Sequence, residues 1–175
     1  GPFSEVNNCN SGDNLSIVCG LEKSPEDIVI TPDNKYLIIS GFGGIAPLHE
    51  SNDPRGGEGS IFLMDAYTKA NNSLNIRYED NVWGDGVCDR DSESSFNPHG
   101  IDLVKRDDGK YQLGVVNHLP FETIEMFELL KTDIESSNEE IVPIWELVWR
   151  GCVSVPEEYY LNDVSLASDG SLFVT

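Results

Sequence analysis

Four short segments of the 175-residue sequence place polar side chains where predicted β-strands begin or end. They are the adjacent carboxylates Glu26 and Asp27, the turn Phe96-Asn97-Pro98-His99-Gly100-Ile101, the strand end Val115-Val116-Asn117-His118, and the pair Asn162 and Asp163. Carboxylate, amide and carbonyl oxygens are the ligands that calcium prefers. A neutral imidazole can take a proton from water near neutral pH. These residue types therefore fit a calcium site with a histidine base beside it.

The two pairs of neighbouring ligands impose a geometry of their own. Consecutive side chains of a β-strand point to opposite faces. Glu26 and Asp27 therefore cannot easily bind one ion, and neither can Asn162 and Asp163. Two stacked calcium sites, each using one member of each pair, would satisfy this constraint.

The charge of the chain excludes some partners. Its 11 Lys and Arg against 31 Asp and Glu give a formal net charge of −20. Such an excess disfavours nucleic acid, whose phosphates need basic side chains, and it disfavours anionic membrane surfaces. It favours cations. No apolar stretch approaches the roughly 18–20 residues that span a bilayer, so we expect no membrane span.

The elements that must position these residues are short β runs rich in Val, Ile, Leu and aromatics, separated by Gly, Asp, Asn and Pro. We predict strands over 27–30, 35–40, 60–65, 74–78, 100–104, 112–117, 124–129, 144–148, 163–166 and 171–175. Helix signals are weak, and residues 135–141 fit a short turn or a charged loop. The pattern predicts an all-β sandwich, barrel or propeller.

A repeated design favours the propeller. Segments 32–38, 106–113 and 167–173 each place an Asp-containing tight turn before an apolar strand, about 60–75 residues apart. This spacing suits about three four-stranded blades. Three blades would leave unpaired strand edges.

We therefore expect an N-terminal segment, 1–23, followed by the N-terminal half of a single propeller domain, 24–175. The other half would come from a second chain, produced by processing after Thr175, or from sequence that is missing here. The opening Gly1-Pro2 is typical of what a tag-removing protease leaves, so we also expect the natural N-terminus to be missing.

The order of the four polar segments resembles the paraoxonase (serum arylesterase) family, and also the wider group of gluconolactonase-like six-bladed β-propellers. The match at 96–101 is the most specific, and the similarity extends over about residues 9–175. The resemblance implies a six-bladed β-propeller with two calcium ions in its central tunnel, one catalytic and one structural.

The resemblance also implies a role for each residue. Glu26 and Asn162 would help bind the catalytic calcium. The structural calcium would be bound by Asp27, the backbone carbonyl of Ile101, and Asp163. His99 and His118 match the family's histidine pair, in which one ring activates water and the other tunes it. The remaining ligands would lie outside this chain, which should be inactive alone. Either histidine could instead be an ordinary structural residue.

These features predict a calcium-dependent hydrolase of a lactone, an ester or a related acyl bond, with a small-molecule substrate. Calcium would polarise the carbonyl and a His-activated water would attack. One alternative is a non-catalytic binding propeller stapled by calcium. Another is a two-chain autoprocessed hydrolase with a new N-terminal nucleophile after Thr175. The segments 119–122 and 46–58 depart from the family pattern near the expected tunnel mouth, which affects substrate preference.

Cysteines and sequons favour a secreted, disulfide-bearing glycoprotein. The four cysteines lack a CxxC spacing, and sequons begin at Asn14 and Asn71. Buried free thiols in a cytosolic protein are the alternative. A Cys88–Cys152 bridge between blade loops is plausible. Cys9 matches a family cysteine that ties the N-terminus to the far end of the chain, but it could also pair with Cys19.

Other conspicuous residues have ordinary interpretations. His49 is expected on the surface, and the acidic run from Asp85 to Glu93 is expected to form a solvated loop because it lacks the EF-hand pattern. Trp145 and Trp149 have helical spacing, but the β-rich context predicts that they pack in a core or at a strand edge.

Overall fold

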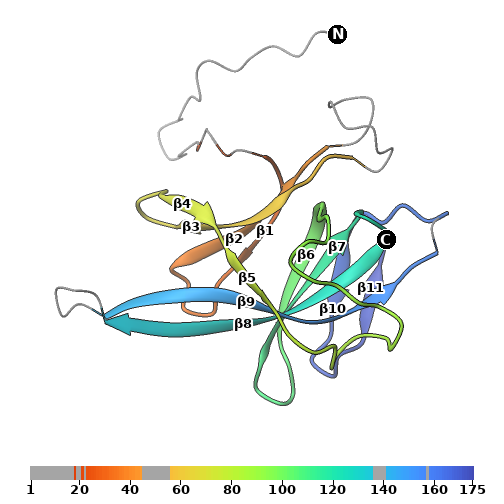
Figure 1. The fold of residues 1–175 in the computed structure, drawn as a ribbon. Helices are drawn as coiled ribbons and strands as arrows, with labels where there is room; N and C mark the ends of the chain where they lie inside the picture. The colour runs from red at the N-terminus through yellow and green to blue at the C-terminus, as the bar shows by residue number, and fades with distance from the viewer. Residues whose placement is uncertain (1–17, 19–20, 22, 45–55, 136–140, 157) are drawn as a thin grey trace, which may run out of the picture.

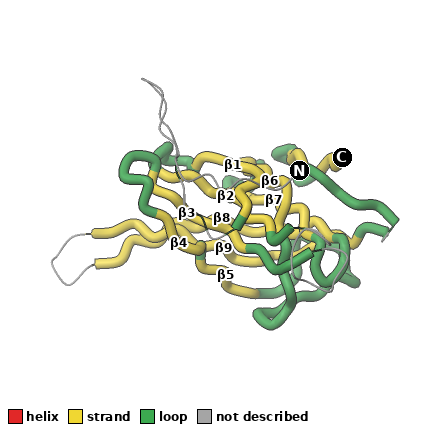
Figure 2. Tube along the Cα trace, turned by 90° about the horizontal axis from the view of Figure 1, so that it is seen from above, coloured by secondary structure: helices red, strands yellow, loops and turns green. Residues whose placement is uncertain are grey.

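A computed structural model describes residues 18, 21, 23–44, 56–135, 141–156 and 158–175 (Figure 1). Over these residues the protein is all-β, as predicted, and Figure 2 shows strands and loops without a helix among them. The strands are β1 (Ser24–Ile30), β2 (Tyr36–Phe42), β3 (Ser60–Asp65), β4 (Asn71–Ser73), β5 (Asn75–Tyr78), β6 (Pro98–Lys105), β7 (Tyr111–Asn117), β8 (Thr123–Glu135), β9 (Ile141–Ser154), β10 (Val164–Leu166) and β11 (Leu172–Val174). No helix in the described part of the chain is long and apolar enough to cross a membrane.

The strands form three successive sheets. The first has the order β1-β2-β3-β4, the second β5-β9-β8-β7-β6, and the third is the pair β10-β11. All neighbours are antiparallel except β5, which lies parallel to β9. One edge strand of each sheet contacts an edge strand of the next, because β1 packs near β6 and β6 near β10. Mainly antiparallel sheets that adjoin through these edge strands are consistent with part of a β-propeller; the number of blades stays a prediction.

The predicted Asp turns join β1 to β2, β6 to β7 and β10 to β11, and all three have the same structure. Each has a residue with positive φ and an Asp carboxylate that accepts the backbone N–H two residues further on. The positive-φ residues are Asn34 (58°), Gly109 (86°) and Gly170 (92°). The carboxylate–amide pairs are Asp33 with Lys35, Asp108 with Lys110, and Asp169 with Ser171. Glycine and asparagine suit this left-handed conformation. The sequence repeat therefore reflects a repeated hairpin.

The run predicted over 74–78 forms strand β5, and the residues just before it form a further short strand, in another sheet, that the sequence did not predict. Residues 71–73 form β4 on the edge of the first sheet, while 75–78 form β5 in the second. Leu74 between them is buried and donates its N–H to Ile61. Burial of this single leucine fixes the point at which the chain crosses, which a local pattern of hydrophobicity does not reveal.

The β8–β9 hairpin is much longer than predicted, with strands of 13 and 14 residues. Its far end projects beyond the other sheets in both views (Figure 1 and Figure 2). Charged residues such as Lys131 hid the strand continuation in the sequence. Trp145 and Trp149 are buried in the main hydrophobic cluster with Leu113, Val115 and Phe127, confirming their predicted packing in a core.

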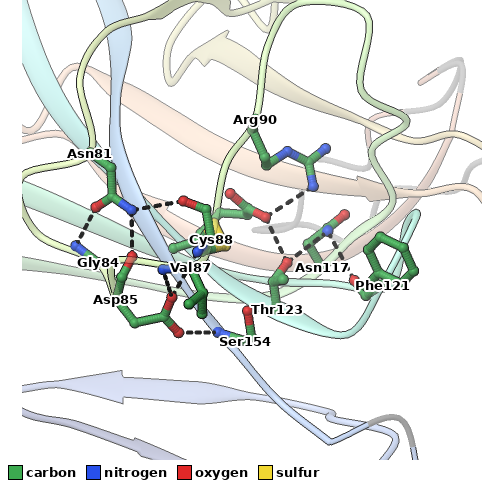
Figure 3. The surroundings of a disulfide bond; sticks show 12 residues. Asn81, Gly84, Asp85, Val87, Cys88, Arg90, Asn117, Phe121, Thr123 and Ser154 are labelled. Carbon is green, nitrogen blue, oxygen red and sulfur yellow. Dashed lines mark hydrogen bonds and ion pairs between the residues drawn. A yellow bond between two sulfur atoms is a disulfide. The ribbon is translucent and has the colours of Figure 1, made fainter.

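The Cys88–Cys152 disulfide is present and joins the loop after β5 to strand β9, with 5.6 Å between the Cα atoms (Figure 3). Asp85 organises this loop, because its carboxylate accepts the N–H groups of Val87, Cys88 and Ser154 at 2.8–3.1 Å. The expectations for Cys9, Cys19, Asn14 and His49 fall outside the described residues.

Candidate active site

Two β-bulges bring the first acid and the first histidine together. The pairing of β1 with β2 is irregular between Pro25 and Asp27, and that of β6 with β7 between Pro98 and Ile101. Bulges redirect side chains out of the regular alternation. Glu26 and His99 lie in these bulges, with 3.0 Å between Glu26 Oε1 and His99 Nε2. The His99 side chain is 9% exposed and that of Glu26 is 41% exposed, so Glu26 lies at the open side of the contact.

The second histidine lies next to the first and deeper in the protein. His118 follows β7 and is fully buried, and its ring centroid is 5.2 Å from that of His99. The Tyr160 ring stacks on His118 at 4.1 Å with an interplanar angle of 11°. Phe42 contacts both imidazole rings. His118 Nδ1 lies 2.9 and 3.0 Å from the two carboxylate oxygens of Glu122, which is also buried.

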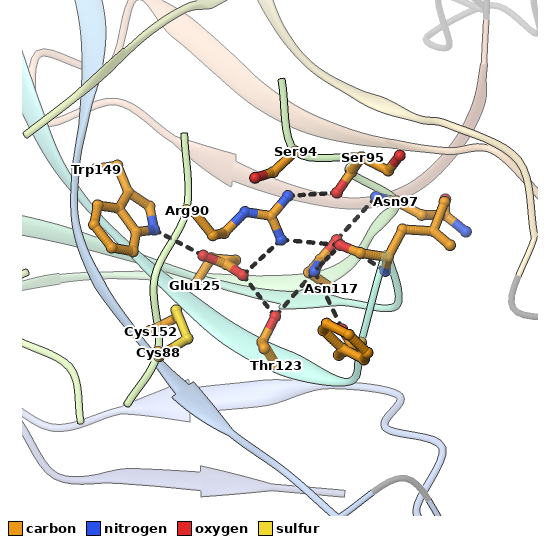
Figure 4. Close-up of polar contacts among 12 residues, drawn as sticks. Cys88, Arg90, Ser94, Ser95, Asn97, Asn117, Thr123, Glu125, Trp149 and Cys152 are labelled. Carbon is orange, nitrogen blue, oxygen red and sulfur yellow. Dashed lines mark hydrogen bonds and ion pairs between the residues drawn. A yellow bond between two sulfur atoms is a disulfide. The ribbon is translucent and has the colours of Figure 1, made fainter. Parts of the chain in front are cut away.

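Two asparagines hold the two histidine loops together. The Asn117 side chain donates to the Leu119 carbonyl at 2.6 Å and to the Thr123 hydroxyl at 2.9 Å. Its carbonyl oxygen accepts the Asn97 N–H at 2.9 Å, as Figure 4 shows. The N–H of His118 in turn donates to the Asn97 carbonyl at 3.2 Å. The backbone at Asn97, two residues before His99, is therefore tied to Asn117 and His118 in the other loop.

Each histidine has one ring nitrogen without a hydrogen-bond partner. Among the described residues, the buried side-chain atoms in this state are His99 Nδ1, His118 Nε2, Gln112 Nε2 and Trp145 Nε1. An unpaired buried polar group typically costs about 1–3 kcal/mol. Two such atoms lie on neighbouring rings, so this pair of rings has ring nitrogens available to a ligand.

A small cavity of about 190 Å³ lies beside this pair, lined by Glu26, Asp27, Gly100, Asn162 and Asp163. A Cβ at Gly100 would overlap the Asp163 carboxylate and lie 2.6 Å from the Asn162 carbonyl oxygen. Gly100 therefore has to be glycine for the β6 bulge to approach the start of β10. The Gly100 N–H donates to that same Asn162 carbonyl at 3.1 Å.

Four of the five predicted metal ligands line this one cavity, although they are far apart in sequence. Asp27 uses its two oxygens to accept the N–H groups of Ile28, at 2.7 Å, and Ile101, at 2.9 Å. Ile101 thus contacts Asp27 through its N–H. The Asp163 carboxylate accepts the Val164 N–H at 2.8 Å.

The donors around the cavity fit a hard cation only in part. All the side-chain donors are oxygens, as calcium requires, and Gly100 keeps the space between them free of a side chain. However, no three His, Cys, Asp or Glu side chains in the described ranges converge closely enough to form a metal cluster by themselves. Calcium needs six to eight oxygens. The cavity residues therefore fit part of a calcium shell that other ligands would complete.

Two residues of the site had no role in the sequence prediction. Glu122 lies within the 119–122 segment that departs from the family pattern, and that departure was the only available signal. Tyr160 had no signal, since its contact with His118 spans 42 positions of the numbering. Burial, together with the carboxylates of Glu122 and Glu26, raises the pKa of Tyr160 to about 12. Tyr160 is therefore a neutral cover over His118 at physiological pH.

Comparisons with known proteins agree on one family. A family model described as Arylesterase matches residues 5–138. Serum paraoxonase/arylesterase 2 of Rattus norvegicus is 30% identical over 138 residues, which is 74% of this chain and 35% of the relative. Serum paraoxonase/arylesterase 1 of Homo sapiens is 33% identical over 128 residues, 71% and 30% of the two chains. Serum paraoxonase/lactonase 3 of Oryctolagus cuniculus is 34% identical over 118 residues, 66% and 29% of the two chains.

The chain spans about a third of the length of the curated relatives it matches. The family match includes Glu26, Asp27, His99, Ile101 and His118, and it stops before Asn162. None of these comparisons supports a separate second chain.

Proposed function

The chain belongs to the arylesterase (paraoxonase) family, and from this premise we propose that it is part of a hydrolase that cleaves a lactone, an ester or a related acyl bond. The observation that carries the proposal is the contact between His99 and Glu26 at the edge of the oxygen-lined cavity. A candidate base and candidate metal ligands then share one site. The substrate is a small molecule that enters from the open side of Glu26.

The cavity residues would hold calcium in the complete protein. We assign Glu26 and Asn162 to a catalytic ion, and Asp27, Asp163 and the Ile101 carbonyl to a structural one. The all-oxygen donor set and the space kept by Gly100 support this assignment. When bound, such an ion supplies a Lewis acid that polarises the substrate carbonyl and stabilises the oxyanion.

His99 is the proposed general base. Its Nε2 lies against Glu26 on the open side, while its Nδ1 is buried and unpaired. A Glu26 carboxylate engaged as a ligand would leave Nε2 without its partner, and Nε2 could then accept a proton from water. His118, 5.2 Å away between ring centroids, is the neighbouring group that can tune this base.

The complete protein, tested against a panel of lactones and aryl esters, decides the proposal. We expect hydrolysis that a calcium chelator abolishes and that added calcium restores. We also expect His99→Gln to lower kcat by about 10²–10⁴-fold with little change in stability, because a general base contributes rates of that order. Activity that survives chelation would refute the calcium mechanism. Equal losses of activity and stability would make His99 structural.

A calcium-stapled binding propeller would also contain the cavity, but it has no use for the unpaired nitrogens of two neighbouring histidines. The substrate panel separates the two functions. We further propose that the protein is secreted, supported by the Cys88–Cys152 disulfide and by relatives whose names describe serum proteins. The remaining blades would come from the rest of the propeller.

A further inference from the structure

Glu122 is a buried carboxylate whose partners in the described residues include no lysine or arginine ion pair. Its two oxygens lie 2.9 and 3.0 Å from His118 Nδ1, and one of them also accepts the Leu161 N–H at 3.4 Å. A buried carboxylate is costly unless it is paired or hydrogen-bonded. Glu122 therefore depends mainly on the His118 ring, and the ring in turn is oriented by Glu122.

This contact determines which nitrogen of His118 carries the proton. An ionised carboxylate can only accept hydrogen bonds, so Nδ1 must be the protonated nitrogen of a neutral His118 ring. Nε2 then carries a lone pair. The stacked ring of Tyr160 and the edge contact of Phe42 prevent the His118 ring from turning over.

The same argument explains why two adjacent nitrogens remain unpaired. With its Nε2–H directed at Glu26, His99 also has a lone pair at Nδ1. Two lone pairs cannot form a hydrogen bond, so His99 Nδ1 and His118 Nε2 both lack a partner. A His99 ring that gives up the Glu26 contact can carry its proton on Nδ1, and His118 Nε2 is then a suitable acceptor.

We infer that Glu122 is a positioning residue for the histidine pair: it fixes His118 as a proton acceptor at Nε2, and so favours the form of His99 whose Nε2 is free to act as the base. This inference rests on the proposed function. When His99 takes a proton from water at Nε2, the proton on Nδ1 can pass to His118 Nε2, and the positive charge then lies beside the Glu122 carboxylate. The water O–H bond breaks as the His99 Nε2–H bond forms, and the water oxygen bonds to the substrate carbonyl carbon; the Nδ1–H bond of His99 breaks as the Nε2–H bond of His118 forms.

Nitrogen-15 NMR of the complete protein with labelled histidine tests the orientation directly. The His118 signals are identified by their loss in His118→Gln. We expect neutral His118 to carry its proton on Nδ1. A ring protonated predominantly on Nε2 would overturn the inference, and this result needs neither catalytic activity nor a Glu122 variant.

Kinetics test the consequence. Glu122→Leu removes the acceptor, and we expect kcat to fall by about 10–100-fold, the effect of losing the carboxylate that orients a metal-binding histidine, taken here as the guide for an oriented catalytic ring. KM should change by less than about twofold, because Glu122 does not line the cavity. Glu122→Gln keeps an acceptor oxygen and should restore most of the lost kcat and the Nδ1–H form. A packing role would instead show equal kcat for the Leu variant and the parent protein.

Glu128→Leu is the matched control. Glu128 is also a buried glutamate, within β8, and it pairs with Lys110 and Arg150 rather than with a histidine. We expect it to lose stability but to keep its kcat and its His118 signals. If Glu122→Leu does not fold, the NMR measurement of the His118 tautomer in the parent protein still tests the inference. If the protein hydrolyses no ester or lactone, the proposed function fails, but the same NMR measurement still shows whether Glu122 orients His118. If Glu122→Leu turns over as fast as the parent protein, only this inference fails.

Discussion

Two buried polar clusters contact the turn after β7, and they differ in how completely they are paired. In the arginine cluster, Arg90 donates to Glu125 and to the Leu119 carbonyl, both at 2.9 Å (Figure 4). Glu125 also accepts from the Thr123 hydroxyl at 2.6 Å and the Trp149 indole at 2.7 Å. In the histidine cluster, His99 and His118 each keep an unpaired nitrogen.

The more complete pairing of the arginine cluster suits a structural role, and the unpaired nitrogens of the histidine cluster suit the proposed site. Burial raises the pKa of Glu125, but the Arg90 charge and the hydrogen bonds from Thr123 and Trp149 oppose that rise. The arginine cluster thus holds the loop before β6 against strands β8 and β9, and the Arg90, Thr123 and Trp149 donors all have acceptors. The histidine cluster leaves two ring nitrogens unpaired, which costs stability and which the proposed reaction would use.

Breaking the arginine cluster should have the largest effect on stability. Arg90→Met leaves the Glu125 charge buried without its cation, so we expect unfolding free energy to fall by about 3–5 kcal/mol. Urea unfolding of the complete protein measures it, and kcat of the folded fraction should change little. The double variant Arg90→Met/Glu125→Leu should recover most of the loss. A single variant as stable as the parent would show that the ion pair is not part of the scaffold.

The disulfide beside this cluster should come next. Cys88 and Cys152 are 64 positions apart, and a loop of that size predicts a loss of up to about 4 kcal/mol when both become serine. Reductant should shift the urea midpoint of the parent protein and leave that of the double-serine variant unchanged. An unchanged parent midpoint would mean that the bridge adds no stability.

Gly100→Ala tests the cavity beside the histidine cluster, and we expect it to change stability less than the two variants above. The new methyl group would press on Asp163 and the Asn162 carbonyl, so we expect about 1–3 kcal/mol of destabilisation. We also expect weaker calcium binding by titration calorimetry. Gly86→Ala is the control, because nothing lies within 4 Å of its added Cβ. Equal calcium affinity in both variants would show that the cavity beside Gly100 is not where calcium binds.

The smallest effect is expected at Asp85, beside the disulfide. The Ser154 N–H, opposed by burial and aided by the Val87 and Cys88 N–H groups, holds the pKa of Asp85 below 3.8. A carboxyl whose folded pKa is lowered stabilises the fold above the unfolded pKa, and this contribution disappears as pH falls through the folded value. Asp85→Asn should therefore cost less than about 1 kcal/mol at pH 7. The difference from the parent, followed by urea unfolding, should vanish near pH 2; a constant difference would contradict the charge explanation.

The sequence predicted the parts of this molecule that local patterns determine. The Asp turns at Asp33, Asp108 and Asp169 fix their own hairpins through contacts two residues apart, so the strands around them were recognisable. It was harder to predict which distant residues lie side by side. The resemblance indicated that Glu26, His99 and His118 belong together, but no local pattern predicts that Tyr160 stacks on His118.

Interactions between distant segments also explain the differences in the fold. The length of β8 and β9 depends on cross-strand pairing, which offsets the low strand propensity of charged residues such as Lys131. The division between β4 and β5 depends on where Leu74 finds a buried position. Neither effect leaves a periodic signal in a single sequence.

The three Asp turns also have a consequence for the order of folding. Each closes a hairpin within a few residues, so the loop-closure entropy for β1–β2, β6–β7 and β10–β11 is small and we expect these hairpins to form early. The proposed ligands and bases come from different hairpins and can meet only after these units dock. Pulse-labelled hydrogen exchange should therefore protect the amides of β2 and β7 before the Ile101 amide, which bonds to Asp27 across two sheets. The reaction centre would be the last thing that this chain acquires as it folds.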